Sequence, residues 1–297
     1  MSRKRVDLLL ENITIKACAA EGKALTHWNG VVVFVPFAVP GDVVDIRVTK
    51  KSKNYYEGFV ERIVTPSKDR LEPFCRHFGV CGGCKWQPLP YPMQLEAKRQ
   101  QVYDQLVRIG HLDVPEIRPT IPSDKTQYYR NKLEFTFSSK RWLLNGEDLD
   151  SVPENDRMGL GFHVGKFFDK VLDIRHCYLQ KDPSNDIRLF VKKYAVDNGL
   201  DFFDIRQNIG YVRNMFVRTT DTGDLMVIMC FFYENREDRE KMLDAIANAF
   251  PQITSLYYII NNKLNDSIGD QECILYKGEP TIRETMEKLT FRIGPKS

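Results

Sequence analysis

Three cysteines that stand close together have the residue types and spacing of a metal site. Cys75, Cys81 and Cys84 form a C-x5-C-x2-C array, with Gly82 and Gly83 inside its tight turn. Thiolates at this spacing can converge on one metal centre, and glycines let the backbone bend without a Cβ penalty. A fourth ligand must come from downstream or from a histidine, and the candidates are Cys177, Cys230, Cys273, His77 and His176.

The cellular compartment decides whether the cysteines form disulfides or bind a metal. The N-terminus lacks the apolar stretch of a signal peptide, and no run approaches the length of a membrane span. These features predict a cytoplasmic, reducing environment in which a disulfide framework is not expected. Four thiolates hold either zinc or an iron–sulfur cluster, and the spacing alone favours zinc.

A longer phrase surrounds the array. Residues 67–84 read S-K-D-R-L-E-P-F-C-R-H-F-G-V-C-G-G-C, and they are followed by Q-L-x-x-K at 94–98 and L-x-R-I-G at 106–110. This combination resembles the RNA uracil-5-methyltransferases, and more narrowly their 23S ribosomal RNA branch, whose members have an N-terminal TRAM domain and a [4Fe-4S] cluster. The resemblance implies a [4Fe-4S] cluster, with zinc as the alternative, and the ligands Cys75, Cys81, Cys84 and Cys177. Cys18, Cys230 and Cys273 lie in apolar contexts and are predicted to be core residues.

The resemblance also implies a reaction and the parts that it needs. In the family a thiolate adds to C6 of uracil, C5 attacks the methyl group of S-adenosylmethionine, and a base removes the C5 proton. The family places these parts after a phrase like L-T-F-R-I-G-P-K-S at 289–297, where this sequence ends. We therefore expect that the Rossmann-like methyltransferase domain is missing and that this chain alone is inactive. No catalytic or cofactor-binding residue is assigned, and S-adenosylmethionine is expected only through the missing domain.

The N-terminal residues predict a small barrel that contacts RNA. Short alternating strands separated by turn signals between residues 11 and 64 are typical of a closed OB-type barrel, and several phrases resemble the TRAM module. Residues 1–70 carry 12 Lys/Arg against 8 Asp/Glu within a chain of net charge +3, which suits a polyanionic partner. One loop mixes cations with aromatic rings and can neutralise phosphate while it stacks bases. The predicted contacts in it are Lys50, Lys51, Lys53 and Tyr55.

The rest of the chain predicts a mixed domain of helices and strands. The periodicity predicts an amphipathic helix at 93–110, and from residue 128 an α/β (α+β) pattern follows. The resemblance implies that this helix packs on the missing catalytic domain. Arg130 and Lys132, in the phrase Y-Y-R-N-K, are further predicted RNA contacts, since a guanidinium beside aromatic rings can pair phosphate or stack on a base. The glycines at 159–165 resemble a dinucleotide-binding loop, but apolar and polar residues alternate along the segment as in a strand. The interpretation as a dinucleotide-binding loop is therefore rejected.

The predicted organisation has five parts. These are a TRAM-like OB-fold domain at 1–66, a cysteine loop at 67–92, the helix segment at 93–125, a central α/β domain at 126–288 and the start of a truncated methyltransferase domain at 289–297. The predicted function is RNA recognition within an enzyme that forms 5-methyluridine in 23S ribosomal RNA, as a monomer and without a membrane. The alternatives are a stand-alone RNA-binding iron–sulfur or zinc protein and part of a transfer RNA uracil-5-methyltransferase.

Overall fold

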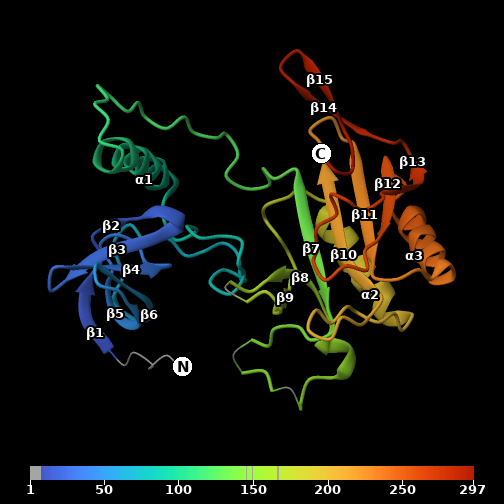
Figure 1. Ribbon diagram of the computed structural model, residues 1–297, viewed down its shortest axis with the longest axis horizontal. Helices are drawn as coiled ribbons and strands as arrows, with labels where there is room; N and C mark the ends of the chain where they lie inside the picture. Colours follow the sequence, from blue (N-terminus) through green and yellow to red (C-terminus); the bar gives the residue numbers. More distant parts are fainter. Residues whose placement is uncertain (1–7, 145, 149, 166) are drawn as a thin grey trace. The chain divides into compact units, whose positions relative to one another are not determined.

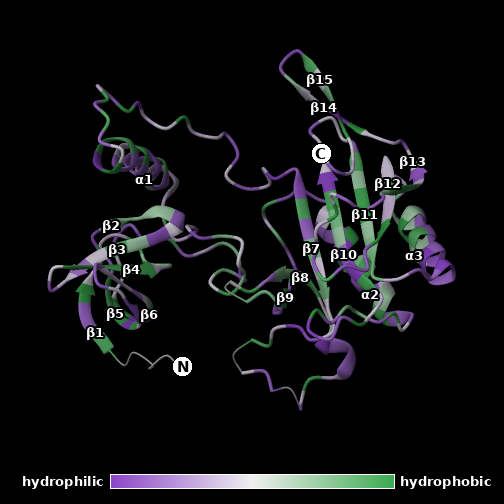
Figure 2. Ribbon diagram, in the orientation of Figure 1, coloured by the Kyte–Doolittle hydropathy of each residue, from purple (hydrophilic) through white to green (hydrophobic). Residues whose placement is uncertain are grey.

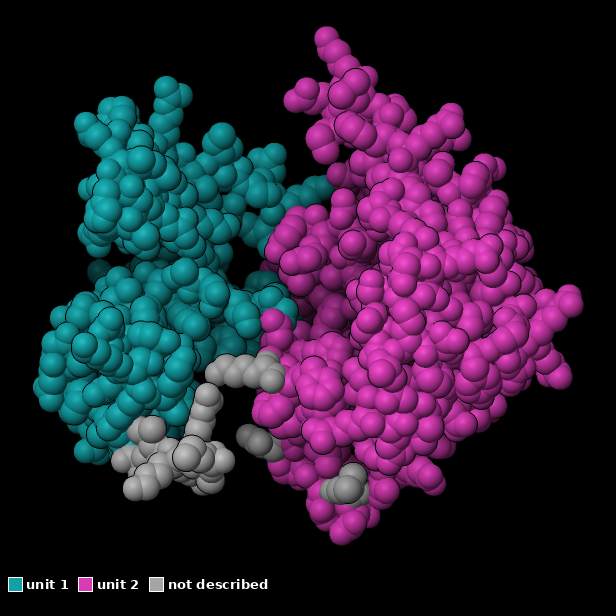
Figure 3. Space-filling view, in the orientation of Figure 1, with its two compact units in different colours: residues 1–79, 83–126 teal, residues 80–82, 127–297 magenta. Residues whose placement is uncertain are grey.

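The structure is a computed structural model that describes residues 8–144, 146–148, 150–165 and 167–297. The chain divides into two compact units, which Figure 3 distinguishes by colour. Unit 1 comprises Met1–Gly79 and Gly83–Thr126, and unit 2 comprises Val80–Gly82 and Gln127–Ser297. The expected N-terminal domain at 1–66 begins with seven residues that lie outside the described part. The three central residues of the cysteine loop belong to unit 2, so the loop is not the separate segment expected at 67–92.

Unit 1 is built on a six-stranded sheet in the order β1-β5-β6-β4-β3-β2. Its strands, seen in Figure 1, are β1 (Leu8–Thr14), β2 (Ala17–Cys18), β3 (Lys23–Trp28), β4 (Val31–Pro36), β5 (Val43–Lys51) and β6 (Tyr55–Thr65). The backbone N–H of Ile15 donates to Asp42 beside β5, and that of Lys16 donates to Leu25 of β3. These two bonds hold the short connection between the edge strands β1 and β2 against β5 on one side and β3 on the other, which suits the predicted OB-type barrel.

The barrel encloses an apolar core that follows the alternation of its strands. Val33 and Val35 of β4 and Val44, Ile46 and Val48 of β5 are all buried in it. Inward positions spaced two apart are what a half-buried strand predicts, so the sequence pattern accounts for this unit directly.

After the barrel, unit 1 continues into one helical segment. Helix α1 (Tyr91–Tyr103) runs on as a π-helical turn (Asp104–Ile109) and ends at Gly110, where helix 93–110 was predicted to end. Neither part contains a buried residue, and Val102 and Ile109 of the predicted apolar face are exposed. The following segment lies along the helix, because the hydroxyl of Thr120 donates to the carbonyl of Leu95 at 2.9 Å.

Unit 2 is a mixed sheet of seven strands in the order β13-β12-β11-β10-β7-β8-β9. Only β11 and β12 run parallel within it; the other pairs are antiparallel. Its strands are β7 (Lys132–Ser138), β8 (Gly159–His163), β9 (Val171–Asp173), β10 (Val212–Thr219), β11 (Leu225–Phe231), β12 (Ser255–Ile260) and β13 (Ile274–Gly278). Strand β11 is hydrophobic throughout, as Figure 2 shows, whereas β10 also carries polar residues such as Arg213 and Arg218. Strands and helices both form in this part of the chain, as the α/β (α+β) pattern predicts.

Different segments cover the two faces of this sheet. Helices α2 (Ser184–Asp197) and α3 (Arg236–Ala249) pack on one face through residues such as Val191 and Leu243. On the other face Ile282 is fully buried against Phe216 and Ile228 of the sheet. The sheet is therefore covered on both sides within unit 2, as buried apolar strands require.

The last strands were not predicted. β14 (Ile282–Met286) and β15 (Leu289–Ile293) pair in an antiparallel hairpin. Residues 289–293, expected to begin another domain, thus belong to unit 2. The physical reason is local pairing: each residue of β15 lies opposite one of β14, from Met286–Leu289 to Ile282–Ile293.

The glycines near residue 160 serve strand packing. A Cβ built on Gly161 would lie 2.1 Å from the carbonyl oxygen of Leu172 and 2.7 Å from Cγ1 of Ile174. Gly159–His163 is strand β8, paired with both β7 and β9. The rejection of a dinucleotide loop is confirmed, because these glycines allow close strand contact and do not open a helix.

Buried Arg213 of β10 fixes the loop that follows β12. Its guanidinium is fully buried, donates to the carbonyls of Asn261, Lys263 and Asn265, and forms an ion pair with Asp266. The charge lies 4.5 Å from the centre of the Phe203 ring. A buried arginine with this many acceptors is satisfied, so Arg213 is structural.

Candidate nucleic-acid interface

The predicted RNA-binding loop of unit 1 lies between β5 and β6. Lys50, Lys51 and Lys53 are exposed, whereas Tyr55 and Tyr56 are half-buried. The ammonium of Lys50 lies 5.1 Å from the ring centre of Tyr55, and that of Lys51 lies 5.6 Å from the ring centre of Tyr56. The strands therefore hold the rings in place and display the cations to solvent.

Neighbouring aromatic residues support both tyrosines from the barrel. Tyr55 meets Phe34 edge to face at 5.9 Å between ring centres, and Tyr56 lies 6.3 Å from Trp28. The contact of Phe34 with Tyr55 follows from the parallel pairing of β4 with β6, in which Val32 is opposite Tyr55. Tyr56 and Trp28 of β3 instead pack against the barrel core, because successive residues of a strand face opposite sides. Tyr55 therefore stands beside the cationic loop, and a ring beside cations is a combination that binds single-stranded nucleic acid in other barrels.

The lysines of this loop differ in whether they have a hydrogen-bond or carboxylate partner. Lys50 donates to the hydroxyl of Tyr55 at 2.9 Å and lies 3.6 Å from a carboxylate oxygen of Glu57. The hydrogen bond with Tyr55, followed by the charge of Glu57, raises the pKa of Lys50, so this ammonium stays protonated. Lys51 and Lys53 have no carboxylate partner in the described part of the chain. These two side chains are available to phosphate.

Arg130 and Lys132 lie at the start of β7 in unit 2, and both are exposed. The backbone N–H of Arg130 donates to the carbonyl of Leu179 at 2.8 Å, so its position is fixed by the segment that follows Cys177. No ion pair involves its guanidinium within the described ranges. The Tyr128 ring packs against His176 and Tyr178, and the role of Arg130 as an RNA contact stays a prediction.

Sequence reasoning missed part of this region. His176 was considered only as a metal ligand, and Tyr178 was not considered at all. The hydroxyl of Tyr128 lies 3.1 Å from Nε2 of His176, and the rings of His176 and Tyr178 are 4.5 Å apart. Both residues flank Cys177 in the sequence, and that adjacency was the available signal.

The four predicted cysteine ligands are divided between the units. Cys75 and Cys84 belong to unit 1, and Cys81 and Cys177 belong to unit 2. Burial raises the pKa of the Cys75 thiol, and the nearby Cys84 adds to this rise. Within the described residues, no group of three or more His, Cys, Asp or Glu side chains is arranged to hold a metal ion. Each unit by itself supplies two of the four thiols, too few for a tetrahedral site.

Gly82 has a different role from the one predicted for it. Its backbone N–H donates to the carbonyl of His163 at 3.1 Å, and an added Cβ would lie 2.8 Å from that oxygen. The adjacent Cys81 forms a β-bridge with Val164. The glycine therefore permits close contact between residues 81–82 and the end of β8, all within unit 2.

The side chain of Asn185, in helix α2, forms hydrogen bonds with the backbone of the buried residue Cys177. The side-chain oxygen of Asn185 accepts from the Cys177 N–H at 2.8 Å, and its amide donates to the Cys177 carbonyl at 3.2 Å. Asn185 is in turn bound by Asp182 at 3.0 Å. Both polar groups of the Cys177 backbone are thus satisfied from one side chain.

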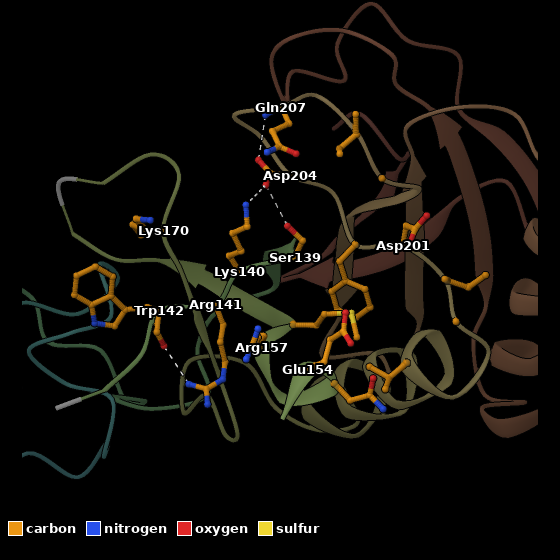
Figure 4. Close-up of a pocket in the computed structure, with 18 of the residues that line it drawn as sticks. Ser139, Lys140, Arg141, Trp142, Glu154, Arg157, Lys170, Asp201, Asp204 and Gln207 are labelled. Atoms are coloured by element: carbon orange, nitrogen blue, oxygen red, sulfur yellow. Dashed lines mark hydrogen bonds and ion pairs between the residues drawn. The ribbon is translucent and has the colours of Figure 1, made fainter. Parts of the chain in front are cut away.

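A cavity of unit 2 lies apart from the predicted site. It has a volume of ≈ 890 Å³, and none of the residues predicted to bind RNA or metal lines it. Figure 4 shows Lys140 beside Asp204, with which it forms an ion pair at 3.1 Å. Arg141, also labelled there, forms an ion pair at 2.8 Å with Glu147, which does not line the cavity. Both of these cations thus have a carboxylate partner.

Comparison with known proteins gives the following relationships. Residues 10–60 match the TRAM domain family. An uncharacterized RNA methyltransferase of Porphyromonas gingivalis is 53% identical over 285 residues, which are 94% of this chain and 61% of that protein. One of Bacteroides thetaiotaomicron is 49% identical over 94% of this chain and 62% of that protein. The chain thus spans about three fifths of the length of these relatives.

A solved structure agrees with the fold. The tRNA (uracil-54, C5)-methyltransferase of Pyrococcus abyssi, in complex with S-adenosyl-L-homocysteine, matches 96% of this chain and 60% of that chain. The TM-score is 0.66 at 24% sequence identity. This likeness supports the architecture described above. No helix among the described residues is long and apolar enough to cross a membrane.

Two predictions are corrected by these comparisons. The sequence was expected to lack the methyltransferase domain and to be an inactive fragment, because it ends at 289–297. That reasoning was wrong: nearly the whole chain, 94–96%, matches RNA methyltransferases. The residue at which a sequence ends does not show what the protein contains or whether it is active.

The Asn185 contact gives the first testable prediction. Replacing Asn185 with Ala removes both hydrogen bonds to the buried Cys177 backbone, and should lower the free energy of unfolding by about 2–4 kcal/mol in urea titrations. The matched control is Asn198→Ala, which removes an exposed bond to the carbonyl of Tyr194 and should cost less than about 0.5 kcal/mol. Equal effects of the two substitutions would contradict the role given to Asn185.

Proposed function

We propose that this chain belongs to an S-adenosylmethionine-dependent methyltransferase that modifies C5 of uracil in RNA, and that the chain binds that RNA. The observation that carries the proposal is the cationic and aromatic loop at 50–56, on a barrel whose residues 10–60 match the TRAM family. The similarity of 94% of the chain to proteins named as RNA methyltransferases supports the activity.

The cofactor and the target base follow from the relatives. The Pyrococcus abyssi enzyme acts on uracil C5 and was solved with S-adenosyl-L-homocysteine, which remains when S-adenosylmethionine gives up its methyl group. The cysteine phrase at 75–84 supports ribosomal RNA, in particular 23S RNA, as the substrate. The transfer RNA substrate of the Pyrococcus abyssi enzyme supports the alternative.

A methylation assay tests the activity. The whole protein is incubated with S-adenosylmethionine labelled in its methyl group and with unmodified 23S or transfer RNA transcripts. We expect label in 5-methyluridine of one transcript class after nuclease digestion. Label in another nucleoside, or none in either transcript, would overturn the proposed reaction.

The loop at 50–56 predicts a specific salt dependence of RNA binding. Each phosphate contact contributes about 0.7 to the slope of log affinity against log salt for single strands. Replacing Lys51 and Lys53 with Ala should therefore lower this slope by about 1.4 and weaken binding. Fluorescence anisotropy with a labelled single-stranded RNA at several salt concentrations measures both quantities.

The control for this measurement removes two cations elsewhere. Lys193 and Lys241 form exposed ion pairs within α2 and α3, with Asp197 and Glu237. Replacing these lysines with Ala changes the net charge equally, so their double variant should keep the original slope. An equal loss of slope in both double variants would show that only net charge matters.

We also propose that Cys75, Cys81, Cys84 and Cys177 ligate a [4Fe-4S] cluster. Support comes from the proximity of Cys75 to Cys84 and from the hydrogen bonds by which Asn185 fixes the backbone of Cys177. None of the seven thiols is in a disulfide. Four thiolates are the usual ligands of such a cluster, and zinc is the competing occupant.

Metal analysis decides between these occupants. Protein purified without oxygen should contain iron and acid-labile sulfide and absorb near 400 nm. Cys177→Ser should lose most of both, whereas Cys18→Ser, which alters a thiol of the barrel, should retain them. Stoichiometric zinc without iron would refute the cluster.

A further inference from the structure

Three aromatic side chains of unit 2 form a surface cluster outside the barrel. Tyr128 lies 6.3 Å from His176 and 6.0 Å from Tyr178, measured between ring centres, and His176 lies 4.5 Å from Tyr178. The interplanar angles are 79°, 52° and 64°, so the rings meet at their edges. No two of these rings are therefore stacked face to face.

The backbone holds this cluster in a fixed place. The N–H of Tyr128 donates to the carbonyl of Tyr178 at 2.7 Å, and that of Arg130 donates to Leu179. Tyr128 has a positive φ of 54°, a conformation that is costly for a tyrosine unless its surroundings determine it. The chain thus accepts local strain to keep the Tyr128 ring beside His176.

Helix α2 fixes the other side of the cluster. Asn185 binds both backbone polar groups of Cys177, which lies between His176 and Tyr178. The guanidinium of Arg188, which is fully buried, donates to the carbonyls of Ile174 and Arg175. Segment 174–177 is therefore attached to α2 at several points, and the rings that flank Cys177 have a rigid base. A preorganised site loses little conformational entropy when it binds a ligand.

The cluster is accessible and lies among cations. Tyr128 is 37% exposed and its neighbour Tyr129 is 53% exposed. Arg130 and Arg175 are exposed, and neither forms an ion pair in the described part of the chain. Burial raises the pKa of Tyr128, and the charge of Asp182, whose carboxylate accepts a hydrogen bond from Asn185 at 3.0 Å, adds to this rise. Exposed rings beside free guanidinium groups offer a base-stacking face and a phosphate contact together.

We propose that Tyr128, His176 and Tyr178 form a stacking platform for one unpaired nucleobase of the RNA, with Arg130 and Arg175 placed to contact the adjoining phosphates. This inference rests on the proposed RNA-binding function but not on the loop at 50–56, which belongs to the other unit. The platform reads the ring face of a base, so it selects unpaired over paired nucleotides and does not distinguish sequences strongly.

A fluorescent base tests the platform. Single-stranded RNA oligonucleotides that carry one 2-aminopurine report stacking as quenching of its fluorescence. We expect quenching by the chain at one or more label positions, and in Tyr128→Leu we expect loss of this quenching with about 10-fold weaker binding. Tyr128→Phe keeps the ring but removes the contact with His176, and should retain most of the quenching.

A matched tyrosine provides the control. Tyr233 is 45% exposed and lies against Tyr211, away from the platform residues in the sequence and in its contacts. Tyr233→Leu should leave quenching and affinity unchanged, and thermal unfolding of each variant confirms that it folds.

The outcomes separate the two proposals. If the unaltered chain binds no RNA by anisotropy, the proposed function fails. If it binds RNA but Tyr128→Leu quenches as strongly as the unaltered chain, the platform is wrong while RNA binding stands. If Tyr128→Leu melts at a lower temperature, the folded Tyr128→Phe variant together with Tyr178→Leu decides the question: quenching kept by Tyr178→Leu overturns the platform.

Discussion

The attachment of residues 174–177 to helix α2 is the constraint on which the surface of unit 2 depends. Asn185 binds the Cys177 backbone at both polar groups, and Arg188 binds the carbonyls before it. Neighbouring side chains of this segment lie on different sides of it. Cys177 is buried, whereas the flanking His176 and Tyr178 contact Tyr128 near the surface. One set of buried hydrogen bonds thereby positions both a proposed metal ligand and a proposed base-stacking surface.

Unit 1 reaches a similar chemical result by a different route. In the barrel, the pairing of β4 with β6 places the ring of Phe34 against that of Tyr55, and the loop carries the lysines. Here strand register positions the rings, whereas in unit 2 side-chain hydrogen bonds do so. Each unit therefore combines aromatic faces with exposed cations, as a protein that binds single-stranded or looped RNA requires.

Local patterns predicted much of the fold. Alternation of apolar residues gave the barrel strands and β7–β13, and the periodic segments gave α1, α2 and α3, because these signals come from residues close in sequence. The hairpin of β14 and β15 was missed, since three of its apolar side chains, Met286, Leu289 and Phe291, are exposed and mark no core. Its sequence was instead interpreted by its likeness to a family phrase.

The site was predicted less completely, and the reason is long-range contact. The positions of the lysines and tyrosines at 50–56 followed from composition alone. A glycine is required at position 82 because the carbonyl of His163 lies close to it. The position of Tyr128 depends on its hydrogen bond with Tyr178, fifty residues later in the chain. No local pattern encodes such contacts. The expectation of a missing methyltransferase domain and an inactive chain failed for another reason. It was drawn from the residue at which the sequence ends, and that residue says nothing about the structure.

Crosslinking tests the central claim, that both units bind RNA, most directly. The chain is irradiated with RNA that contains 4-thiouridine, and the crosslinked peptides are identified by mass spectrometry. The account predicts crosslinks in the segment 50–56 of unit 1 and in the segments 128–130 and 176–178 of unit 2. RNA that binds but crosslinks only outside these segments would contradict it.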